Sequence, residues 1–152
     1  LEKLKIQYDY AMITIGQVGS SRIRQNCFAF LKALGFILPV IVSPLAHVSP
    51  HAALEEGTMV LHHVIVNAGA RIGSNCILNT RSLIEHDVQV GAHTHISTAA
   101  VVNGQTQVGS GSFIGSNATV VQGVRLPDDY FFRAGCLVTR REDGQRIKEA
   151  IV

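Results

Sequence analysis

The residues best suited to chemistry in this sequence are three consecutive polar residues, Glu85, His86 and Asp87. The ordinary pKa of histidine lets its side chain accept a proton near neutral pH. A carboxylate beside the ring can orient one ring nitrogen and raise the basicity of the other. The triplet therefore predicts a general base, His86, with a carboxylate available on either side.

These residues lie within a repeat whose period is six residues. The bulky apolar residues that recur at this period are Val48, Leu54, Val60, Val66, Ile72, Leu78, Ile84, Val90, Ile96, Val102, Val108, Ile114, Val120, Leu126, Phe132 and Val138. A period of six fits neither the turn of an α-helix nor the alternation of a strand. It is typical of a parallel β-helix built from hexapeptides.

The repeat also predicts which residues are neighbours in space. Three hexads form one triangular coil, so each residue lies about 4.8 Å from the residue 18 positions earlier. This register places Ala68 and Gly104 on the two sides of His86. Two such small neighbours are expected to leave room beside the ring for another molecule. Because no insertion interrupts the hexads, we expect shallow grooves, and a deep site only between subunits or against another domain.

The N-terminal residues, 1–45, do not follow the repeat. A short apolar run over 10–15 predicts a buried strand, a helix is expected to begin at Ser20 or Ser21, and a second strand is expected over 36–42. The apolar stripe expected on the helix consists of Ile23, Cys27, Phe30, Leu31 and Leu34. This βαβ pattern predicts the C-terminal part of a Rossmann-like α/β domain. The first residue is leucine, so we expect the chain to be the tail of a larger domain.

The predicted fold class is therefore mainly β. Residues 46–140 are expected to form the parallel β-helix, preceded by the Rossmann-like part over 1–45. Residues 141–152 lose the repeat. A β-helix needs its terminal edge covered, so this last segment is expected to cap the final coil.

The composition predicts one soluble, compact protein. Of its 152 residues 47% are hydrophobic, and the formal net charge is +2. A balance so near neutral argues against nucleic acid or a membrane surface as a partner. No stretch is apolar for long enough to span a bilayer, and no signal peptide is visible. Cys76 and Cys136 fall in a column of small residues, which predicts buried, reduced thiols and a cytoplasmic location.

Two runs around His86 resemble a known group of enzymes. They are residues 79–87 (NTRSLIEHD) and 90–97 (VGAHTHIS). This block is similar to that of the left-handed β-helix acyltransferases, namely the sugar O- and N-acetyltransferases of the sialic acid and bacillosamine pathways. The resemblance implies a left-handed β-helix, acetyl-CoA as co-substrate, a nucleotide-sugar-binding N-terminal domain, and a homotrimer with the acyl donor between two prisms.

The same resemblance implies roles for individual residues. The histidine matching His86 is the general base, and the acidic residue matching Asp87 increases its basicity. Asn79 would lie at the sugar and the acetyl group, and Gly16 would contact the nucleotide sugar. The residues implied to contact acetyl-CoA are His95, Gly104, Ser116 and Ala134.

The expected reaction is direct transfer of an acetyl group to the amine of a nucleotide-linked sugar, a UDP-4-amino-sugar. A protonated amine cannot attack a thioester, so His86 would remove the proton as attack proceeds. Backbone N–H groups beside small residues could stabilise the oxyanion. No cysteine or serine stands next to a base in a way that suggests a covalent acyl-enzyme.

Three alternatives stay open on the sequence alone. The acceptor could be a hydroxyl of a sialic acid. A zinc hydratase of the γ-carbonic anhydrase type shares the prism, but His86, His93 and His95 lack its histidine spacing, and no metal ligand is predicted. A non-catalytic scaffold is the third, and the His86–Asp87 pair argues against it. The histidines expected at the surface are His47, His51, His62 and His63.

Overall fold

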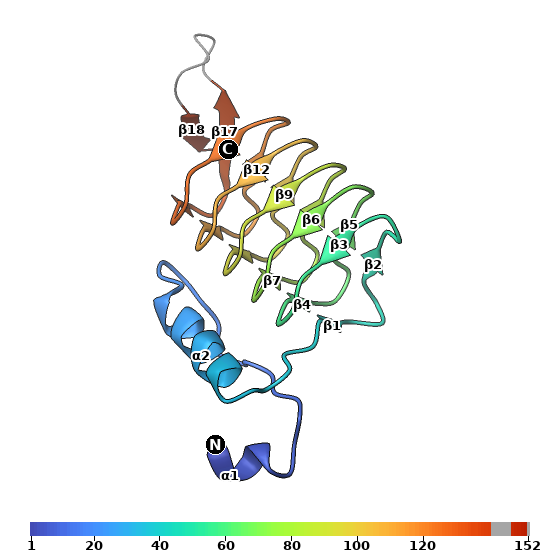
Figure 1. Cartoon of the computed structure of the whole chain (residues 1–152). Coiled ribbons are helices and arrows are strands. Elements are labelled where there is room, and N and C mark those ends of the chain that lie inside the picture. Colours follow the sequence, from blue (N-terminus) through green and yellow to red (C-terminus); the bar gives the residue numbers. More distant parts are fainter. Residues whose placement is uncertain (141–146, 152) are drawn as a thin grey trace.

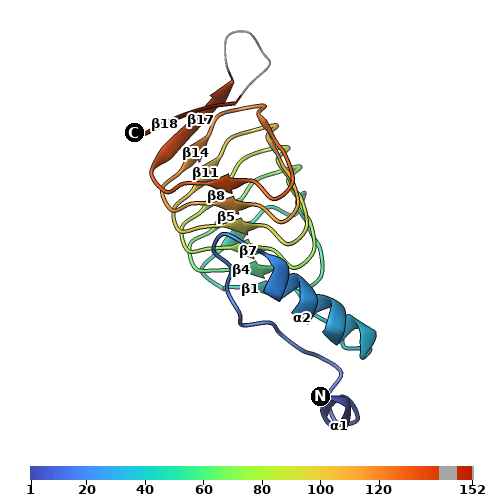
Figure 2. The ribbon, with the colours of Figure 1, turned by 90° about the vertical axis from the view of Figure 1, so that its left-hand side faces the viewer.

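The computed structural model describes residues 1–140 and 147–151. Figure 1 shows successive coils stacked into a prism, with the helical part of the chain at its N-terminal end. This part contains α1 (Glu2–Lys5) and α2 (Arg22–Ala33). Helix α2 lies beside the first coils of the prism in both ribbon views (Figures 1 and 2). The mainly β fold, a left-handed parallel β-helix, is therefore confirmed.

The strands form three sheets, one on each side of the prism. Sheet I contains β1 (Ile41–Val42), β4 (Met59–Val60), β7 (Ile77–Leu78), β10 (His95–Ile96), β13 (Phe113–Ile114) and β16 (Phe131–Phe132). Sheet II contains β2 (His47–Val48), β5 (Ile65–Val66), β8 (Leu83–Ile84), β11 (Val101–Val102), β14 (Thr119–Val120), β17 (Cys136–Arg140) and β18 (Ile147–Ile151). Sheet III contains β3 (Ala53–Leu54), β6 (Arg71–Ile72), β9 (Gln89–Val90), β12 (Gln107–Val108) and β15 (Arg125–Leu126). The chain passes through sheets I, II and III in turn, so each edge of the prism consists of the turns between two sheets.

The predicted 18-residue register is confirmed. In sheet II, Ile84 pairs with Val66 on one side and with Val102 on the other. The hexad residues from Val60 to Val138 are all buried and form one core along the prism axis. Burial of each such side chain contributes about 1.5–3 kcal/mol, so this column is the main source of stability.

Glycine recurs at one corner of the prism because the coils approach closely there. A Cβ atom at Gly91 would lie 2.5 Å from the backbone nitrogen of Ser110 on the next coil. Gly73 and Gly109 occupy the same corner on the neighbouring coils and face similar backbone contacts. Any side chain at these positions would therefore separate the coils.

The buried strand expected over residues 10–15 is wrong. Tyr10 and Ile37 make an isolated parallel bridge, and Tyr10 and Ile15 are exposed. The carbonyls of Ile13 and Ile15 instead accept hydrogen bonds from the guanidinium of Arg24, each at 2.9 Å. This run therefore binds to α2 and, through the single bridge, to Ile37.

The second expected strand, over 36–42, is shorter than predicted. Pro39 has no N–H with which to continue a strand ladder. Within this range the named strand is β1, which pairs with β4 and so belongs to the prism. The hexad pattern thus begins one strand earlier than expected. A Rossmann-like domain over residues 1–45 stays a prediction.

Helix α2 is confirmed, and the expected apolar stripe is only partly covered, with Cys27, Leu31 and Leu34 half-buried. Ile23 is 67% exposed and Phe30 is 53% exposed, whereas Arg24 is 1% exposed. Arg24 can be buried because its guanidinium donates to backbone carbonyls of the N-terminal run and of the prism. The helix ends as expected before Gly35, whose φ is +82°.

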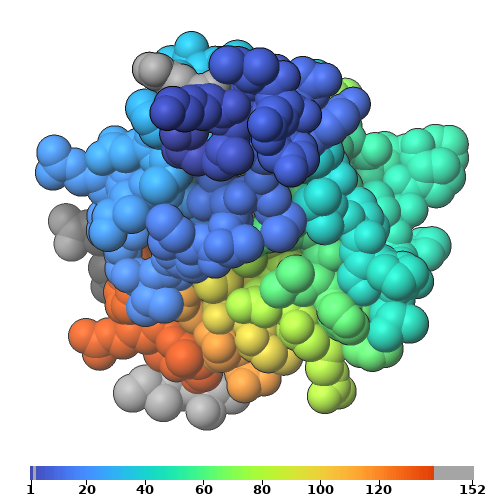
Figure 3. All heavy atoms as spheres, turned by 90° about the horizontal axis from the view of Figure 1, so that it is seen from below, coloured from blue at the N-terminus to red at the C-terminus, as the bar shows by residue number. Residues whose placement is uncertain are grey.

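At the other end of the prism, β18 pairs antiparallel with β17 and occupies the edge of sheet II (Figure 2). Residues 141–146 and 152 lie outside the described residues, so a capping role for the whole segment stays a prediction. Figure 3 shows the N-terminal segment covering part of the face seen from below. In the part of the chain that the structure describes, no helix has the length and hydropathy needed to span a membrane.

Candidate active site

His86 and Asp87 lie in the turn between β8 and β9, on the edge between sheets II and III. Asp87 adopts the left-handed conformation, with φ of +59°. Its Oδ2 lies 3.0 Å from Nδ1 of His86. Because a carboxylate oxygen accepts, Nδ1 carries the proton, and the lone pair of Nε2 is available on a neutral ring. The His86 side chain is 51% exposed, so a substrate can reach this nitrogen.

The structure separates the roles of the two neighbouring carboxylates. Glu85 does not contact the ring; its Oε2 accepts the backbone N–H of His86 at 3.2 Å. The same oxygen accepts a hydrogen bond from Nδ2 of Asn67, one coil away, at 3.0 Å. Glu85 therefore fixes the backbone of the turn, while Asp87 orients the imidazole.

The predicted neighbours of His86 are confirmed by backbone hydrogen bonds. The N–H of Gln105 donates to the carbonyl of His86, and the N–H of Asp87 donates to the carbonyl of Ala68, both at 3.0 Å. A Cβ atom at Gly104 would lie 2.6 Å from Nε2 of His86. On this side, the space that a side chain at Gly104 would take is filled by the imidazole of His86, which lies against the glycine backbone.

A second glycine lies against the carboxylate of the pair, and we did not predict it. A Cβ atom at Gly69 would collide with Oδ1 of Asp87. Gly69 precedes Asp87 by 18 residues, as Asn67 precedes Glu85, so the register that placed Ala68 could have found both residues. The His86–Asp87 pair is therefore held between Gly69 on one coil and Gly104 on the next.

The other predicted site residues gather on a different edge, between sheets I and II. Nδ2 of Asn79 lies 3.1 Å from Nε2 of His95. Nδ1 of His95 lies 2.7 Å from the carbonyl oxygen of Gln17, which follows Gly16 directly. His95 is 6% exposed, and this burial lowers its pKa below the ordinary value. Nothing in the sequence pattern pointed to Gln17.

Ser116 and Ala134 lie on the same edge as Asn79. Ser116 follows β13 and Ala134 follows β16, so both occupy turns that lead from sheet I to sheet II. The carbonyl of Ser116 accepts the N–H of Gly135, and its hydroxyl lies 2.9 Å from that of Ser97. The structure therefore brings Asn79, Ser116 and Ala134 to the edge between sheets I and II, with His95 beside them in β10 of sheet I. Gly16 is next to Gln17, whose carbonyl reaches His95. The structure places His86, Asp87 and Gly104 on the other side of sheet II.

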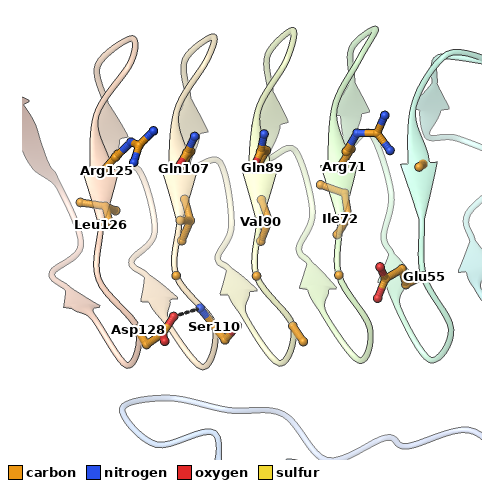
Figure 4. A pocket seen from close by; sticks show the side chains of 16 residues that line it. Glu55, Arg71, Ile72, Gln89, Val90, Gln107, Ser110, Arg125, Leu126 and Asp128 are labelled. Atoms are coloured by element: carbon orange, nitrogen blue, oxygen red, sulfur yellow. Dashed lines mark hydrogen bonds between the residues drawn. The ribbon is translucent and has the colours of Figure 1, made fainter.

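A groove of about 560 Å³ runs along the outer face of sheet III (Figure 4). One side is lined by Arg71, Gln89, Gln107 and Arg125, from successive strands. The carboxylates of Glu55 and Asp128 lie on the other side, and Asp128 accepts the N–H of Ser110 at 2.7 Å. None of the predicted site residues, all of which are described, lines this groove.

The histidines do not form a metal site within one subunit. Among the described residues, no group of three or more His, Cys, Asp or Glu side chains could hold a metal ion. His93 instead accepts a hydrogen bond from Nδ2 of Asn75 at 2.9 Å, and its ring packs edge-on against Phe28.

Several solved structures are similar to this chain over most of its length. A histidine-to-asparagine mutant of perosamine N-acetyltransferase from Caulobacter crescentus, solved with CoA and GDP-perosamine, is 33% identical. That match covers 91% of this chain and 65% of that chain, with a TM-score of 0.87. The acetyltransferase domain of PglB from Neisseria gonorrhoeae FA1090 is also 33% identical, over 90% of this chain and 68% of that chain, with a TM-score of 0.80. The same domain in complex with acetyl coenzyme A is 31% identical, with a TM-score of 0.73.

No protein-family model matches the chain. The prism of hexads and its similarity to these acetyltransferases place the chain in the class of hexapeptide-repeat acyltransferases. Within that class, the chain belongs to the family of left-handed β-helix sugar N-acetyltransferases. It spans about two thirds of the length of the solved chains that it matches.

Proposed function

We propose that this protein transfers the acetyl group of acetyl-CoA to the amine of a nucleotide-linked amino sugar. The observation that carries the proposal is the geometry of His86. Its Nδ1 is held by Asp87, and its half-exposed ring lies with Nε2 beside Gly104. The similar enzyme from Caulobacter crescentus was solved with CoA and GDP-perosamine, and the similar PglB domain with acetyl coenzyme A. These ligands support acetyl-CoA as the donor and a nucleotide sugar as the acceptor.

His86 would act as the general base. As the amine nitrogen attacks the thioester carbon, Nε2 of His86 takes one proton from that nitrogen. The new C–N bond forms and the carbonyl becomes an oxyanion. When the oxyanion collapses, the C–S bond breaks, and the imidazolium returns the proton to the departing CoA thiolate. The carboxylate of Asp87 stabilises the imidazolium between these two steps.

The backbone of Gly104 is suited to stabilise the oxyanion. Its N–H has no hydrogen-bond partner among the described residues, and the ring of His86 lies against this glycine. A backbone donor fixed by the coils needs no reorganisation when negative charge develops, which is the condition for strong electrostatic catalysis.

We further propose that the site is completed between subunits of a homotrimer. Within one chain, sheet II separates the edge that carries His86 from the edge that carries Asn79 and His95. In sheet II, the residues that directly precede the core residues of the hexads point away from the core and are mostly apolar: His47, Ile65, Leu83, Val101, Thr119 and Leu137. A neighbouring prism against this face would bring His86 of one subunit beside Asn79 and His95 of the next. Flat prisms related by a threefold axis close into a ring with identical contacts.

The test is an acetyl-transfer assay with the full-length protein. Acetyl-CoA is supplied with a UDP-4-amino-sugar, GDP-perosamine or a sialic acid, and the free thiol and the acetylated product are measured. Amide formation on a nucleotide amino sugar supports the proposal. Ester formation on the sialic acid alone would establish the O-acetyltransferase alternative, and failure with every acceptor would favour a scaffold. Carbon dioxide hydration by the zinc-supplemented protein tests the hydratase alternative.

The homotrimer and the cytoplasmic location stay predictions. The homotrimer can be tested by sedimentation. Sedimentation at micromolar concentration should give a mass three times that of the chain. A monomer would remove the intersubunit site. The three cysteines are free thiols, two of them buried, which fits the reduced, cytoplasmic state expected from their positions.

A further inference from the structure

Gln17 joins the N-terminal segment to the predicted transfer site. Its Nε2 donates to the carbonyls of His93, at 2.9 Å, and of Ser112, at 3.3 Å. These carbonyls belong to successive coils of the prism, and Gln17 is 5% exposed. The backbone carbonyl of Gln17 is thereby held 2.7 Å from Nδ1 of His95.

These contacts fix the tautomer of His95. The carbonyl of Gln17 can only accept, so Nδ1 of His95 must carry a proton. The amide nitrogen of Asn79 can only donate, so Nε2 of His95, 3.1 Å away, must be the acceptor. A histidine bonded in this way is neutral. Burial acts in the same direction, because it lowers the pKa of His95.

The tautomer in turn fixes the carboxamide of Asn79. One N–H of its Nδ2 is bound by His95, and its Oδ1 accepts the N–H of Thr80 at 2.8 Å. The second N–H of Nδ2 has no partner within the part of the chain that the structure describes. Asn79 is half-buried, so this N–H can donate a hydrogen bond to a bound molecule.

The N-terminal segment is held in this position by Arg24 as well as by Gln17. The guanidinium of Arg24 donates to Ile13 and Ile15 in the segment and to the carbonyls of Asn75 and Gly57 on the prism. Arg24 is 1% exposed and links α2, the segment and two coils. The position of the Gln17 carbonyl is therefore determined by several buried hydrogen bonds.

We propose that Gln17 is a positioning residue for the transfer reaction, which sets the Nδ1–H tautomer of His95 and so directs a free N–H of Asn79 at the acceptor sugar. The inference rests on the proposed acetyl transfer. It assigns a role to the N-terminal segment in addition to any contact of Gly16 with the nucleotide. If Nδ1 were unprotonated, Nε2–H would face the amide donor of Asn79, and the carboxamide would have to rotate.

The first experiment reads the tautomer directly and needs no activity. Nitrogen-15 spectra of the histidine rings in the full-length protein should show His95 as a single Nδ1–H tautomer. In Gln17→Met, which keeps the length of the side chain and loses both anchoring hydrogen bonds, a mixture of the two neutral tautomers is expected. Gln25→Met is the matched control, because Gln25 bonds Ser21 on α2 at 2.7 Å and does not touch His95. A wild-type Nε2–H tautomer, or a tautomer unchanged in Gln17→Met, would overturn the proposal.

The second experiment measures acetyl transfer by the same variants. Gln17→Met should lower kcat/KM for the acceptor about tenfold, the effect of one lost hydrogen bond, with KM for acetyl-CoA within about twofold of wild type. Gln25→Met should match wild type. Equal kcat/KM for wild type and Gln17→Met would contradict the positioning role. Absence of transfer in all three proteins would reject the proposed function instead, and the tautomer spectra would still report on the Gln17–His95 contact.

A third variant covers the case in which Gln17→Met does not fold. Asn79→Asp replaces the amide donor with an acceptor while Gln17 still requires a proton on Nδ1. His95 can then satisfy both neighbours only as the imidazolium. Its pKa should therefore rise well above the wild-type value when the ring is titrated by NMR. A neutral His95 that moves its proton to Nε2 in this variant would show that Gln17 does not determine the tautomer.

Discussion

The imidazole of His86 lies against the backbone of Gly104, one coil further along the prism. A Cβ atom at Gly104 would come within 2.6 Å of Nε2 and 2.7 Å of Cε1 of that ring. The absence of a side chain at Gly104 therefore allows the ring of His86, the proposed base, to lie there.

Gly104→Ala should turn the ring of His86 away without unfolding the protein. The atoms that the new methyl group would meet belong to an exposed side chain, which can move. Gly104 is not among the residues with positive φ, so alanine fits its backbone. A misplaced base lowers kcat, in this case by about 10–100-fold. The measurements are steady-state kinetics and thermal unfolding.

Ala68→Gly is the control for this variant. Ala68 lies on the coil at the other side of His86, and the change removes one methyl group there. It should leave kcat within about twofold of wild type and the melting temperature close to it. Wild-type kcat in Gly104→Ala would mean that the ring leaves its position against Gly104 before transfer occurs.

Substitutions at the pair itself should separate the base from its partner. His86→Ala should lower turnover by about 10²–10⁴, the usual contribution of a general base, with an unchanged melting temperature because the side chain is half exposed. Asp87→Asn should have a smaller effect, since the amide can still hold the ring. Glu85→Gln, which alters a carboxylate that does not touch the ring, should have the smallest effect on turnover. A larger loss in Glu85→Gln than in Asp87→Asn would reverse these assignments.

The prism could be predicted because every six-residue repeat carries the same local pattern of apolar residues. One period of six fixes the core, and one register of 18 fixes every neighbour, so Ala68 and Gly104 could be placed beside His86 from the sequence. The same register places Gly69 beside Asp87, a contact that we did not predict. Where the repeat determines the backbone path, the residues that meet across coils can be found by adding or subtracting 18 positions.

The N-terminal segment could not be predicted in this way, because its contacts join positions far apart in the chain. Arg24 lies outside the apolar stripe expected on α2, yet it is buried by hydrogen bonds to carbonyls that have no sequence signature. Gln17 approaches His95 across 78 positions. Apolar periodicity predicted Ile23 and Phe30 as part of the packed face. Such periodicity cannot identify a buried arginine whose guanidinium donates hydrogen bonds to backbone carbonyls.

The pH dependence of stability should reflect two histidines at the junction of the N-terminal segment and the prism. Burial lowers the pKa of His93 and of His95, and the nearby charge of Arg24 lowers both further. Below the ordinary histidine pKa of about 6.5, the unfolded chain therefore binds protons that the folded chain does not. The free energy of unfolding should fall as pH decreases through that range, and should vary little with these groups above it.

Urea unfolding at several pH values between about 5 and 7.5 measures this effect. His93→Gln should reduce the slope of stability against pH, because one of the two groups is removed. His47→Gln is the control, since His47 is exposed and lies away from the junction. Stability that increases as the solution is acidified from neutral pH would contradict the expected sign of the effect.

Gly69 should support the carboxylate of the proposed catalytic pair, and this effect can be separated from its effect on folding. Gly69 and Gly111 are matched: each has positive φ, +75° and +73°, and a Cβ atom at each would collide with an aspartate oxygen on the next coil. The aspartate is Asp87 for Gly69 and Asp129 for Gly111. Only the first belongs to the proposed base pair.

Both Gly69→Ala and Gly111→Ala should lower stability by a similar amount, about 1–2 kcal/mol for an L side chain in the left-handed region. Gly69→Ala should also displace the Asp87 carboxylate from Nδ1 of His86 and lower kcat about tenfold or more, while Gly111→Ala keeps wild-type kcat below its melting temperature. The comparison needs thermal unfolding and kinetics on both proteins at one temperature. Equal losses of kcat would show that turnover follows stability alone, and Gly69 would then have no part in holding the catalytic pair.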